Sequence, residues 1–390
     1  MKRRKTNRKA PDSAVNIDKK VLIMAGGTGG HIFPGLAVAD QLKSEGWTIC
    51  WLGTPKRMEA RLVPEHGYDI QFIDVSGVRG NGLKRLLLAP FMIIRSIIQA
   101  IKVIRRVKPT VVLGFGGFAS GPGGIAAWLL GKPVVLHEQN AIAGFTNRTL
   151  AYFATQVLMA FPKTFARRHK AQLVGNPIRQ SISQLNSLNK SDEDYQPTKP
   201  LLPGVNKLNV LILGGSLGAE ALNRHIPRVL AQTTSVDLIK VWHQTGRGKH
   251  REVEAVYQGA MVNNRDIRID EFIVDMSEAY KWADIAICRS GALTVAEVAA
   301  AGVAAIFVPF PHAVDDHQTL NAGWLADNDA AIIVPQVELE QGKHIQLISD
   351  LLENKSKLQQ MAEKAGQMAI TDATDKVAAV CKGLAGLTNE

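Results

Sequence analysis

One strand-and-turn pattern occurs twice in this chain and limits its fold more than any other feature. Val21–His31 reads VLIMAGGTGGH, and Val210–Glu220 reads VLILGGSLGAE. Both segments combine an apolar strand with two glycines, a hydroxyl residue and a glycine two positions after it. Turns of this kind connect strands to helices in doubly wound sheets, which bind ligands beyond the carboxyl ends of the strands. The repeat predicts an α/β protein with two Rossmann-like, parallel-sheet halves that face each other across a cleft.

Alternating β-rich and helical runs support this architecture along the rest of the chain. A helix is predicted over Gly35–Glu45, and residues 181–207 are polar and proline-containing, which indicates a loop near a domain junction. The length of 390 residues suffices for two domains with separate cores. Strands are predicted at Lys20–Ala25, Trp47–Leu52, Ile70–Val75, Thr110–Phe115, Pro133–His137, Gln156–Ala160, Asn209–Leu213, Asp237–Trp242, Ile267–Ile273, Asp284–Cys288, Ala304–Val308 and Ala331–Val334.

The first turn, Gly26–Gly30, contains four glycines and Thr28. A backbone without Cβ atoms approaches a ligand closely, and N–H groups at a helix start favour phosphate or sugar oxygens. A nicotinamide site of the G-x-G-x-x-G type is excluded because Ile32 stands where the third glycine belongs, and no P-loop motif occurs. A purely structural role is the alternative, which the second turn in a matched place makes less favoured.

His31 follows the first turn directly, so its imidazole is expected at the mouth of the cleft, where it would act as a base near neutral pH. A hydrogen-bonded structural histidine is the alternative. In the second half, Arg289–Glu297 follows a strand and opens an alanine-rich helix whose first N–H groups form a diphosphate site. Glu297, one turn into that helix, is placed to accept two hydrogen bonds from a ribose diol; a solvated helical glutamate is the alternative.

The acidic and cysteine residues do not form a metal-binding pattern. Asp192–Asp194 lies in the polar linker and Asp327–Asp329 in a turn after a helix, so both D-x-D patterns are interpreted as solvated. Cys50, Cys288 and Cys381 are far apart and odd in number, which is typical of a reducing compartment without disulfides. No clustered Cys/His set of the zinc type occurs. We therefore expect neither a metal nor a cofactor.

The net charge of +11 is concentrated in two short segments. Residues 1–20 carry eight Lys/Arg against two Asp, and residues 83–106 carry six Lys/Arg and no acid, which leaves the other 346 residues near −1. A non-catalytic nucleic-acid-binding protein would need a basic groove with stacking aromatics. Aromatic residues make up only 6% of the chain, so this class is disfavoured.

The basic segment 83–106 is predicted to be helical from Phe91 onward. Two stripes lie along it: the apolar Phe91, Ile94, Ile98 and Ile101, and the basic Arg95, Lys102 and Arg106. The helix either faces the core with a solvated basic side, or lies in a membrane interface with its apolar residues among lipid headgroups. Arg95 interrupts the uncharged run, so the segment does not cross a bilayer. The basic N-terminus has no apolar run behind it and is not a signal peptide.

Seven motifs in one order make the sequence resemble the MurG-type UDP-N-acetylglucosamine:undecaprenyl-diphospho-muramoylpentapeptide N-acetylglucosaminyltransferases of peptidoglycan synthesis. The resemblance extends from about Lys20 to about Val380. The motifs are AGGTGGHIFPGLAVA (Ala25–Ala39), GFGGFASGPGG (Gly114–Gly124), VVLHEQNAIAGFTNR (Val134–Arg148), GNPIR (Gly175–Arg179), GGSLGA (Gly214–Ala219), CRSGALTVAE (Cys288–Glu297) and PFPHAVDDHQTLNA (Pro309–Ala322).

The resemblance implies a GT-B fold and a domain division. It places an N-terminal acceptor and membrane domain over residues 19–175 and a UDP-sugar-binding domain over residues 176–365. A C-terminal helix within residues 366–390 would return to the first domain, whereas the basic extension 1–18 lies outside the family core and is expected to be disordered. The family implies a peripheral protein on the cytoplasmic face of the inner membrane.

The resemblance also implies site residues, carried over position by position. His31 matches the histidine proposed as the base, Ser216 and Arg179 would contact the diphosphate, and Gln318 would suit the sugar hydroxyls. Phe118 stands where the family often has a tyrosine, so a phenol hydrogen bond to the acceptor is lost. The full UDP-N-acetylglucosamine set is Thr28, Gly29, Gly30, Asn140, Arg179, Ser216, Ile273, Ala292, Leu293, Thr294, Val295, Ala296, Glu297 and Gln318.

The implied reaction is an inverting, metal-independent transfer. The muramoyl 4-hydroxyl of undecaprenyl-diphospho-MurNAc-pentapeptide attacks the anomeric carbon of N-acetylglucosamine, and UDP leaves. A UDP-sugar 2-epimerase, or a transferase for another lipid acceptor, is the alternative on the same fold. The expected partners are UDP-N-acetylglucosamine, the lipid-linked acceptor and an anionic membrane surface that contacts residues 83–106, without nucleic acid.

Overall fold

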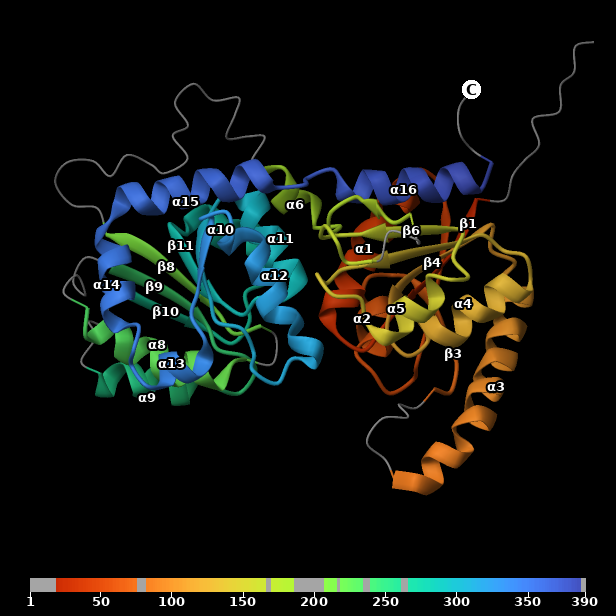
Figure 1. Ribbon diagram of the computed structural model, residues 1–390, viewed down its shortest axis with the longest axis horizontal. Helices are drawn as coiled ribbons and strands as arrows, with labels where there is room; N and C mark the ends of the chain where they lie inside the picture. The colour runs from red at the N-terminus through yellow and green to blue at the C-terminus, as the bar shows by residue number, and fades with distance from the viewer. Residues whose placement is uncertain are drawn as a thin grey trace, which may run out of the picture.

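The computed structural model describes residues 19–75, 82–165, 170–185, 207–215, 218–233, 239–260 and 266–386. These residues form two parallel sheets in separate halves of the molecule (Figure 1). The first sheet has the strand order β3-β2-β1-β4-β5-β6-β7, and the second has the order β10-β9-β8-β11-β12-β13. The expected pair of parallel-sheet domains is confirmed. Part of the predicted linker, residues 186–206, and the extension 1–18 lie outside the described residues.

The elements alternate as the sequence pattern predicts. The first half contains β1 (Lys20–Ala25), α1 (Gly29–Ser44), β2 (Thr48–Gly53), α2 (Glu59–Glu65), β3 (Asp69–Phe72), α3 (Gly82–Val107), β4 (Val111–Gly116), α4 (Ser120–Leu129), β5 (Val134–Glu138), α5 (Phe145–Leu150), β6 (Gln156–Met159) and β7 (Gln172–Leu173). The second half contains α6 (Gln180–Ser183), β8 (Leu208–Leu213), α8 (Glu220–Ala231), β9 (Ile239–Gln244), α9 (His250–Gly259), β10 (Ile267–Asp270), α10 (Met276–Trp282), β11 (Ile285–Cys288), α11 (Ala292–Ala301), β12 (Ala304–Phe307), the 3-10 helix η4 (Val314–Asp316), α12 (His317–Ala326), β13 (Ala331–Ile333), α13 (Gln336–Glu340), α14 (Ile345–Glu353) and α15 (Lys355–Met368), followed by α16 (Ala373–Leu384).

Each sheet is a buried central layer because its inner strands, such as β1, β4, β8 and β11, are largely apolar runs. In β1, Val21 pairs with Ile49 of β2 on one side and Val111 of β4 on the other. Residues of α1 and α16 cover one face of the first sheet, and residues of α3 and α4 cover the other. The second sheet is likewise enclosed, by α10, α11 and α12 on one face and by α8, α9, α14 and α15 on the other. The carboxyl ends of both sheets therefore remain for binding.

The start of α1 differs from its prediction. The helix begins at Gly29 rather than Gly35, so His31 lies in its first turn instead of in the preceding loop. The helix forms despite three glycines and Pro34, which are poor helix formers. Ile32 and Leu36 from this segment are buried in the first core. Tertiary packing thus outweighs local propensity and gives His31 a fixed helical position.

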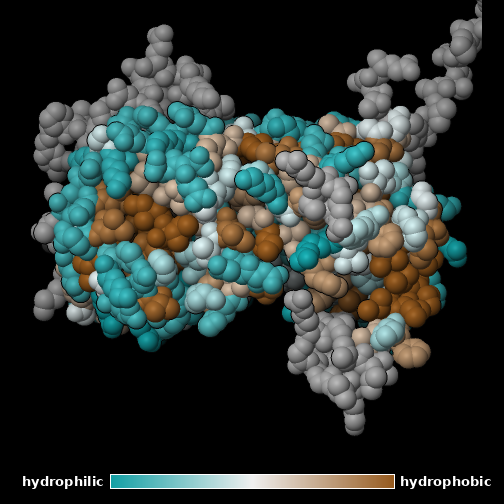
Figure 2. All heavy atoms as spheres, in the orientation of Figure 1, coloured by the Kyte–Doolittle hydropathy of each residue, from teal (hydrophilic) through white to brown (hydrophobic). Residues whose placement is uncertain are grey.

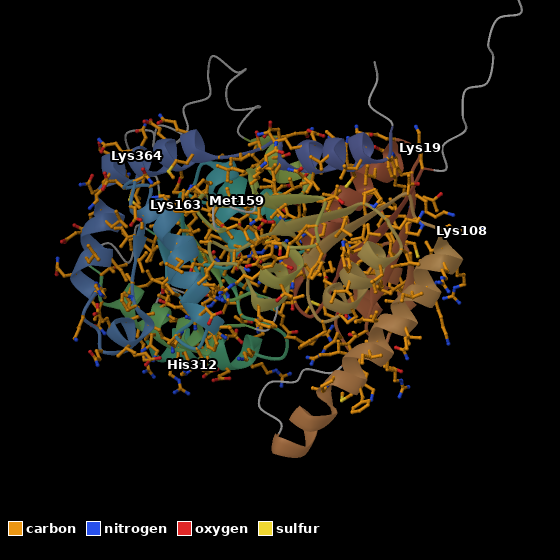
Figure 3. All side chains as sticks on the ribbon, turned by 45° about the vertical axis from the view of Figure 1, so that its right-hand side comes forward. Lys19, Lys108, Met159, Lys163, His312 and Lys364 are labelled. Carbon is orange, nitrogen blue, oxygen red and sulfur yellow. The ribbon has the colours of Figure 1, made fainter. Side chains whose placement is uncertain are left out.

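The apolar stripe of α3 faces outward, away from the first core. Phe91, Ile94 and Ile98 are 72%, 55% and 48% exposed, whereas Ala100 and Ile104 are buried against the first sheet. The interpretation of this apolar stripe as core-facing is therefore wrong, except at Ile101, which packs partly against the core. Figure 3 shows α3 projecting from the first domain, with Lys108 at the end that joins β4.

The chain passes between the halves twice, and the two passages touch. At Gly175, where φ is +85°, a Cβ atom would lie 2.6 Å from Ile370 Cγ2 in the segment between α15 and α16. Thr374 Oγ1 donates a hydrogen bond to Ile178 O, at 3.3 Å. After this passage α16 packs in the first core, and α15 and α16 follow one another along one side of the molecule (Figure 1).

Candidate functional site

The first glycine turn is held by a buried carboxylate. Glu59, at the start of α2, is 1% exposed, and its Oε2 accepts a hydrogen bond from the Gly27 N–H at 2.9 Å. Its Oε1 accepts from Thr54 N at 3.0 Å and Thr54 Oγ1 at 2.7 Å. A Cβ atom at Gly26 would lie 2.6 Å from that same Oε1. The close approach of Glu59 thus requires a glycine at position 26, and the φ of +89° favours one at position 27.

The imidazole of His31 is oriented by the same turn. Its Nδ1 lies 3.1 Å from the carbonyl oxygen of Gly26, which can only accept a hydrogen bond. Nδ1 therefore carries the proton in the neutral ring, and the lone pair is on Nε2. Nε2 faces the loop after β4, since a Cβ atom at Gly116 would lie 3.2 Å from it. This is the tautomer that a general base needs.

The loop after β4 packs directly on the first turn. Gly117 has a φ of +93°, and a Cβ atom there would lie 2.5 Å from Gly26 O. Phe118, the next residue, is 40% exposed, with the guanidinium carbon of Arg57 5.2 Å from the centre of its ring. Two glycine turns from the ends of neighbouring strands thus meet beside His31.

A cavity of about 220 Å³ opens beside His31 and Gly116. The end of β5 and the loop after it also line this cavity, and there the buried Glu138 accepts hydrogen bonds from Asn140 N and Nδ2, Gly144 N and Asn147 Nδ2, at 3.0, 3.2, 3.2 and 2.8 Å. The second domain contributes residues 314, 315 and 317 to the same cavity. The space is therefore shared by both domains, as the predicted cleft requires.

Asn321 of α12 joins the two domains at this cavity. Its Oδ1 accepts the Ala141 N–H at 2.8 Å, and its Nδ2 donates to Asn140 Oδ1 at 3.2 Å. The same Nδ2 donates to Ser290 O, at 3.2 Å, just before α11 begins. A buried amide thus connects the loop beside His31 with the helix that the sequence assigns to the diphosphate.

That helix presents its N-terminus to the cleft without a side-chain cap. Gly291 is the N-cap of α11 and supplies no side chain, so the first N–H groups are available to an anion. Glu297 is only 6% exposed, so the interpretation of this residue as a solvated helical glutamate is wrong. Burial raises the pKa of its carboxyl to about 7, and the Arg179 charge and the hydrogen bond from Tyr280 partly oppose that rise.

Three further residues that the sequence predicts for the site are Arg179, Gln318 and Ile273. The guanidinium carbon of Arg179, at the N-cap of α6, lies 5.0 Å from the centre of the Phe33 ring of α1. Gln318 Oε1 accepts the Phe310 N–H at 2.9 Å, and the buried Ile273 donates its N–H to Gln244 Oε1 at 3.0 Å. Ser216 lies outside the described residues.

Thr28–Gly30 and the first turns of α11 complete the predicted set. Thr28 is the N-cap of α1 but makes no side-chain capping hydrogen bond there, and Gly29 and Gly30 begin the helix. In α11, Ala292 and Val295 are buried. Leu293, Thr294 and Ala296 are partly exposed. The polar side chains among these residues of α11 are therefore those of Thr294 and Glu297.

No cluster of three or more His, Cys, Asp or Glu residues suited to a metal ion occurs among the described residues. Asp329 is exposed and forms an ion pair of 2.9 Å with Lys364, which fits its interpretation as a solvated turn residue. Asp192–Asp194 lies outside the described residues. Within the described part of the chain no helix is both long and apolar enough to span a membrane.

Four residues that shape the site have no clear sequence signal. Glu59 and Glu138 act on backbone N–H groups of loops, and Tyr280 and Asn321 act on other site residues. The alternation of HEQN, which begins at the end of β5 and continues into the following loop, is the one useful pattern, because side chains of neighbouring extended residues point to opposite sides. Glu138 and Asn140 line the cavity, whereas His137 bonds to Gly175 O at 2.9 Å.

Comparison with protein families gives two matches. The glycosyltransferase family 28 N-terminal domain matches residues 21–159, and the glycosyltransferase family 28 C-terminal domain matches residues 209–377. Together the two matches include both glycine turns, His31 and the whole of α11.

Among the curated relatives that match nearly the whole chain, two examples are named UDP-N-acetylglucosamine–N-acetylmuramyl-(pentapeptide) pyrophosphoryl-undecaprenol N-acetylglucosamine transferase. The protein of Aeromonas hydrophila subsp. hydrophila is 53% identical over 371 residues, which covers 95% of this chain and 98% of the relative. The protein of Shewanella sediminis is 53% identical over 374 residues, which covers 96% and 99%.

Solved structures agree with these matches. The crystal structure of Acinetobacter baumannii MurG aligns with a TM-score of 0.76 at 41% identity, and covers 94% of this chain and 99% of that one. A UDP-GlcNAc 2-epimerase from Neisseria meningitidis aligns with a TM-score of 0.63 over 95% of this chain and 100% of its own, but at only 13% identity. The epimerase likeness therefore extends to the fold alone.

Proposed function

Because the chain belongs to glycosyltransferase family 28, we propose that it transfers N-acetylglucosamine from UDP-N-acetylglucosamine to the muramoyl 4-hydroxyl of undecaprenyl-diphospho-MurNAc-pentapeptide, a step of peptidoglycan synthesis. The observation that carries this proposal is the 53% identity, over 95% of the chain, to a transferase of that name. Both domains and the cleft between them are included in that match. The chain is a GT-B N-acetylglucosaminyltransferase.

His31 is the base of the proposed reaction. Its Nδ1 proton is bonded to Gly26 O, so the free lone pair of Nε2 faces the cavity in which an acceptor hydroxyl would lie. Proton removal during attack on the anomeric carbon is typically worth about 10²–10⁴-fold in rate. The attack comes from the face opposite UDP, which gives inversion.

The second domain holds the donor in this proposal. N–H groups at the start of α11, together with Arg179 and Ser216, stabilise the charge that develops on the diphosphate as UDP leaves. Glu297 accepts hydrogen bonds from the ribose hydroxyls of UDP. The backbone at Ile273 contacts the nucleobase, and Gln318 contacts the N-acetylglucosamine ring. From the first domain, Thr28–Gly30 and Asn140 close the site over the sugar. A hydrogen-bond donor that is preorganised to stabilise the charge on the leaving group typically contributes about 10²–10³-fold to the reaction rate.

We divide the chain into an acceptor domain over residues 19–175, a donor domain over residues 176–365 and a C-terminal segment 366–390. This division is supported by the sheets, since β1–β7 precede Gly175 and β8–β13 follow it. It is also supported by α16, whose buried residues pack in the first core.

We further propose that the first domain attaches peripherally to the cytoplasmic face of the inner membrane. The apolar residues of α3, with the half-exposed Trp128 and Leu129 at the end of α4, support this surface. Figure 2 shows apolar residues gathered over the part of the first domain where α3 and α4 lie.

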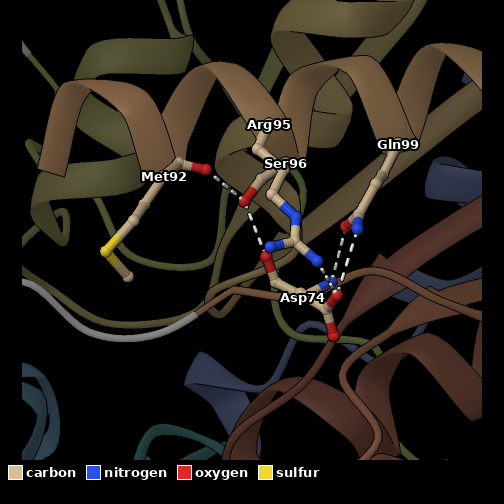
Figure 4. A network of polar contacts seen from close by, with 5 residues as sticks. All are labelled: Asp74, Met92, Arg95, Ser96 and Gln99. Atoms are coloured by element: carbon tan, nitrogen blue, oxygen red, sulfur yellow. Dashed lines mark hydrogen bonds and ion pairs between the residues drawn. The ribbon is translucent and has the colours of Figure 1, made fainter. Parts of the chain in front are cut away.

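A network on α3 fixes its orientation (Figure 4). Asp74 binds Arg95 at 3.2 Å and Gln99 Nε2 at 3.0 Å, and Ser96 Oγ donates to Asp74 O at 2.7 Å. These contacts hold one side of α3 against the segment after β3 and leave Phe91 and Ile94 outward. Each basic residue near an anionic surface adds about 1 kcal/mol to such attachment.

Transfer of labelled N-acetylglucosamine to a short-chain, lipid-linked muramoylpentapeptide tests the proposed reaction. We expect product both with and without EDTA, because the proposed residues supply the charge stabilisation themselves. Absence of product would contradict the transfer, and loss of product with EDTA would contradict its metal-independent form. Incubation of the donor without acceptor separates the alternative 2-epimerase, which would release the epimerised sugar.

A further inference from the structure

The buried carboxylate of Glu297 has only one of its oxygens engaged. Oε2 accepts a hydrogen bond from the Tyr280 hydroxyl at 3.2 Å. Among the described residues, Oε1 has no hydrogen-bond partner, and it is not fully enclosed: part of its surface reaches solvent although Glu297 as a whole is only 6% exposed. A largely buried carboxylate is costly unless its lone pairs are satisfied, so an open, unengaged oxygen one turn into α11 indicates a position for a hydrogen-bond donor of a ligand.

Tyr280 itself is rigidly placed. It lies on α10, is 2% exposed and packs in the second core with Ile273 and Val295. Its hydroxyl has one proton to donate, and Glu297 Oε2 receives it. The ring therefore fixes the rotation of the Glu297 carboxylate as well as its position.

Other groups that face this carboxylate come from two further elements. Arg179 precedes α6, and among the described residues its charge acts on the Glu297 carboxylate. Cys288, at the end of β11, also lies near that carboxylate. The pKa of the Cys288 thiol is raised by burial and by Glu297, so this thiol remains uncharged. Arg179 is itself assigned to the donor diphosphate. Tyr280 is thus the contact that remains with Glu297 whichever way Arg179 turns.

We propose that Tyr280 is a positioning residue for donor recognition, which holds Glu297 Oε2 so that Oε1 is directed at the ribose 2′,3′-diol. The inference rests on the proposed function, since Glu297 must be the ribose acceptor. It assigns to Tyr280 a part of the enzyme's preference for a ribonucleotide donor, without contact between Tyr280 and the substrate.

The test compares the Kd of UDP-N-acetylglucosamine with that of its 2′-deoxyribose analogue by calorimetry. A hydrogen bond to a charged acceptor is worth on the order of 10-fold to 100-fold in affinity, so the wild-type protein should prefer the ribose donor by about that factor. Tyr280→Phe removes one oxygen and leaves no cavity. We expect it to reduce the preference by about 3-fold to 10-fold, with kcat at saturating donor nearly unchanged.

A second readout separates positioning from a general loss of packing. The hydrogen bond from the Tyr280 hydroxyl lowers the pKa of Glu297 and so favours its ionised form. Without that hydroxyl, the pH below which the binding of UDP-N-acetylglucosamine weakens should be higher in Tyr280→Phe than in the wild-type protein. Tyr257→Phe is the matched control: this tyrosine is also fully buried in the second domain, but its hydroxyl bonds His243 Nδ1 at 3.0 Å. It should leave both the ribose preference and the pH dependence as in the wild-type protein.

The outcomes are distinguishable. An unchanged ribose preference in Tyr280→Phe, with the wild-type preference intact, would overturn the role of Tyr280 alone. Equal effects of Tyr280→Phe and Tyr257→Phe would overturn it as well, because they would indicate general destabilisation. A wild-type protein that binds both donors equally would instead overturn the assignment of Glu297 in the proposed function.

Discussion

At the scale of single residues, the roles proposed for His31 and Glu297 depend on hydrogen bonds that a neighbouring residue makes to each of them. The Gly26 carbonyl selects the His31 tautomer, and Tyr280 fixes one oxygen of Glu297. Both hydrogen-bonding partners, the Gly26 carbonyl and the Tyr280 hydroxyl, are uncharged and lie outside the helix that carries the residue. Their proposed functions therefore rely on the turns and cores that keep these neighbours in place.

His31→Gln should reduce kcat by about 10²–10⁴-fold, because the substituted amide cannot take the acceptor proton. The Kd of UDP-N-acetylglucosamine, measured by calorimetry, should change much less than kcat. His66→Gln is the control, since His66 Nδ1 also lies 2.8 Å from a backbone carbonyl, that of Leu62, but at the end of α2. Near-normal turnover of His31→Gln would show that another group is the base.

Donor binding should weaken as the pH falls through about 7, the raised pKa of the Glu297 carboxyl. Below this pH the carboxyl is protonated and loses acceptor capacity toward the ribose hydroxyls. Between pH 8 and pH 6 the ionised fraction, and with it the affinity for UDP-N-acetylglucosamine, should fall by about 10-fold. Calorimetric titrations at a series of pH values measure this. Glu297→Gln should bind more weakly with a nearly flat pH profile, and an equally steep profile would contradict the assignment.

At the scale of elements, the site is assembled from loops at the carboxyl ends of strands, and close backbone contacts fix these loops. The loop after β4 contacts the turn after β1 at Gly117, and the loop after β5 is gathered around Glu138. The first contact depends on the absence of a side chain, and the second on a buried carboxylate. An added methyl group should therefore disturb the contact at Gly117, and removal of the carboxylate should disturb the loop around Glu138.

Gly117→Ala should lower both stability and activity, because its Cβ atom would meet Gly26 O and the residue has a φ of +93°. We expect a loss of about 2–3 kcal/mol in the free energy of unfolding, with donor binding impaired at the first turn. Gly131→Ala is the control: its φ is +64°, but a Cβ atom there meets nothing within 4 Å. It should cost about 1 kcal/mol and leave activity unchanged. Denaturant unfolding measures both, and equal losses would contradict the role of the contact.

Replacing Phe91, Ile94 and Ile98 together by serine should weaken binding to vesicles of anionic lipid by about 100-fold. These side chains are already exposed, so the change removes apolar surface from the membrane contact with little effect on the core. Binding should also weaken with added salt. Val274 and Val337, exposed on the second domain, provide a serine double variant as the control. Vesicle sedimentation measures the effect, and salt-insensitive binding would contradict the basic contribution.

The elements were largely predictable from sequence, whereas the contacts between them were not. Apolar runs such as VLIMA and NVLIL predict their strands because each is buried on both faces. The first turns of α1 were missed because GGHIFP favours a loop locally, and β7 has only two residues. Glu59 and Asn321 could not be identified, because their partners are backbone groups and side chains distant in sequence.

At the scale of the whole molecule, the two domains are joined by two chain passages and by the Asn321 bridge. The C-terminal helix α16 completes the first core with Val377, Ala378 and Cys381, and Lys382 forms an ion pair of 2.7 Å with Glu45 of the first domain. The last part of the chain thus stabilises the first domain, although it follows the second in sequence.

Val377→Ala should destabilise the first domain selectively, by about 1–2 kcal/mol, since Val377 is fully buried in the first core. UDP should raise the thermal transition of the second domain, where we place the donor. Scanning calorimetry with and without UDP assigns the transitions, and Val377→Ala should lower the one that UDP does not shift. Val380, only partly buried against the same core, provides a milder control as Val380→Ala. A lowered UDP-sensitive transition would contradict this assignment.

The contact between Gly175 and Ile370 has a mechanical consequence. Because the two chain segments pack closely side by side there, we expect any rotation of one domain against the other to turn about this contact, as about a pivot. Atoms near the pivot keep their separation during such a swing, and atoms at the open mouth travel along an arc. Spectroscopic rulers attached near residues 175 and 370 should therefore report a constant distance. Two labels placed on opposite sides of the cleft mouth should report a distance that shortens when the enzyme binds its donor.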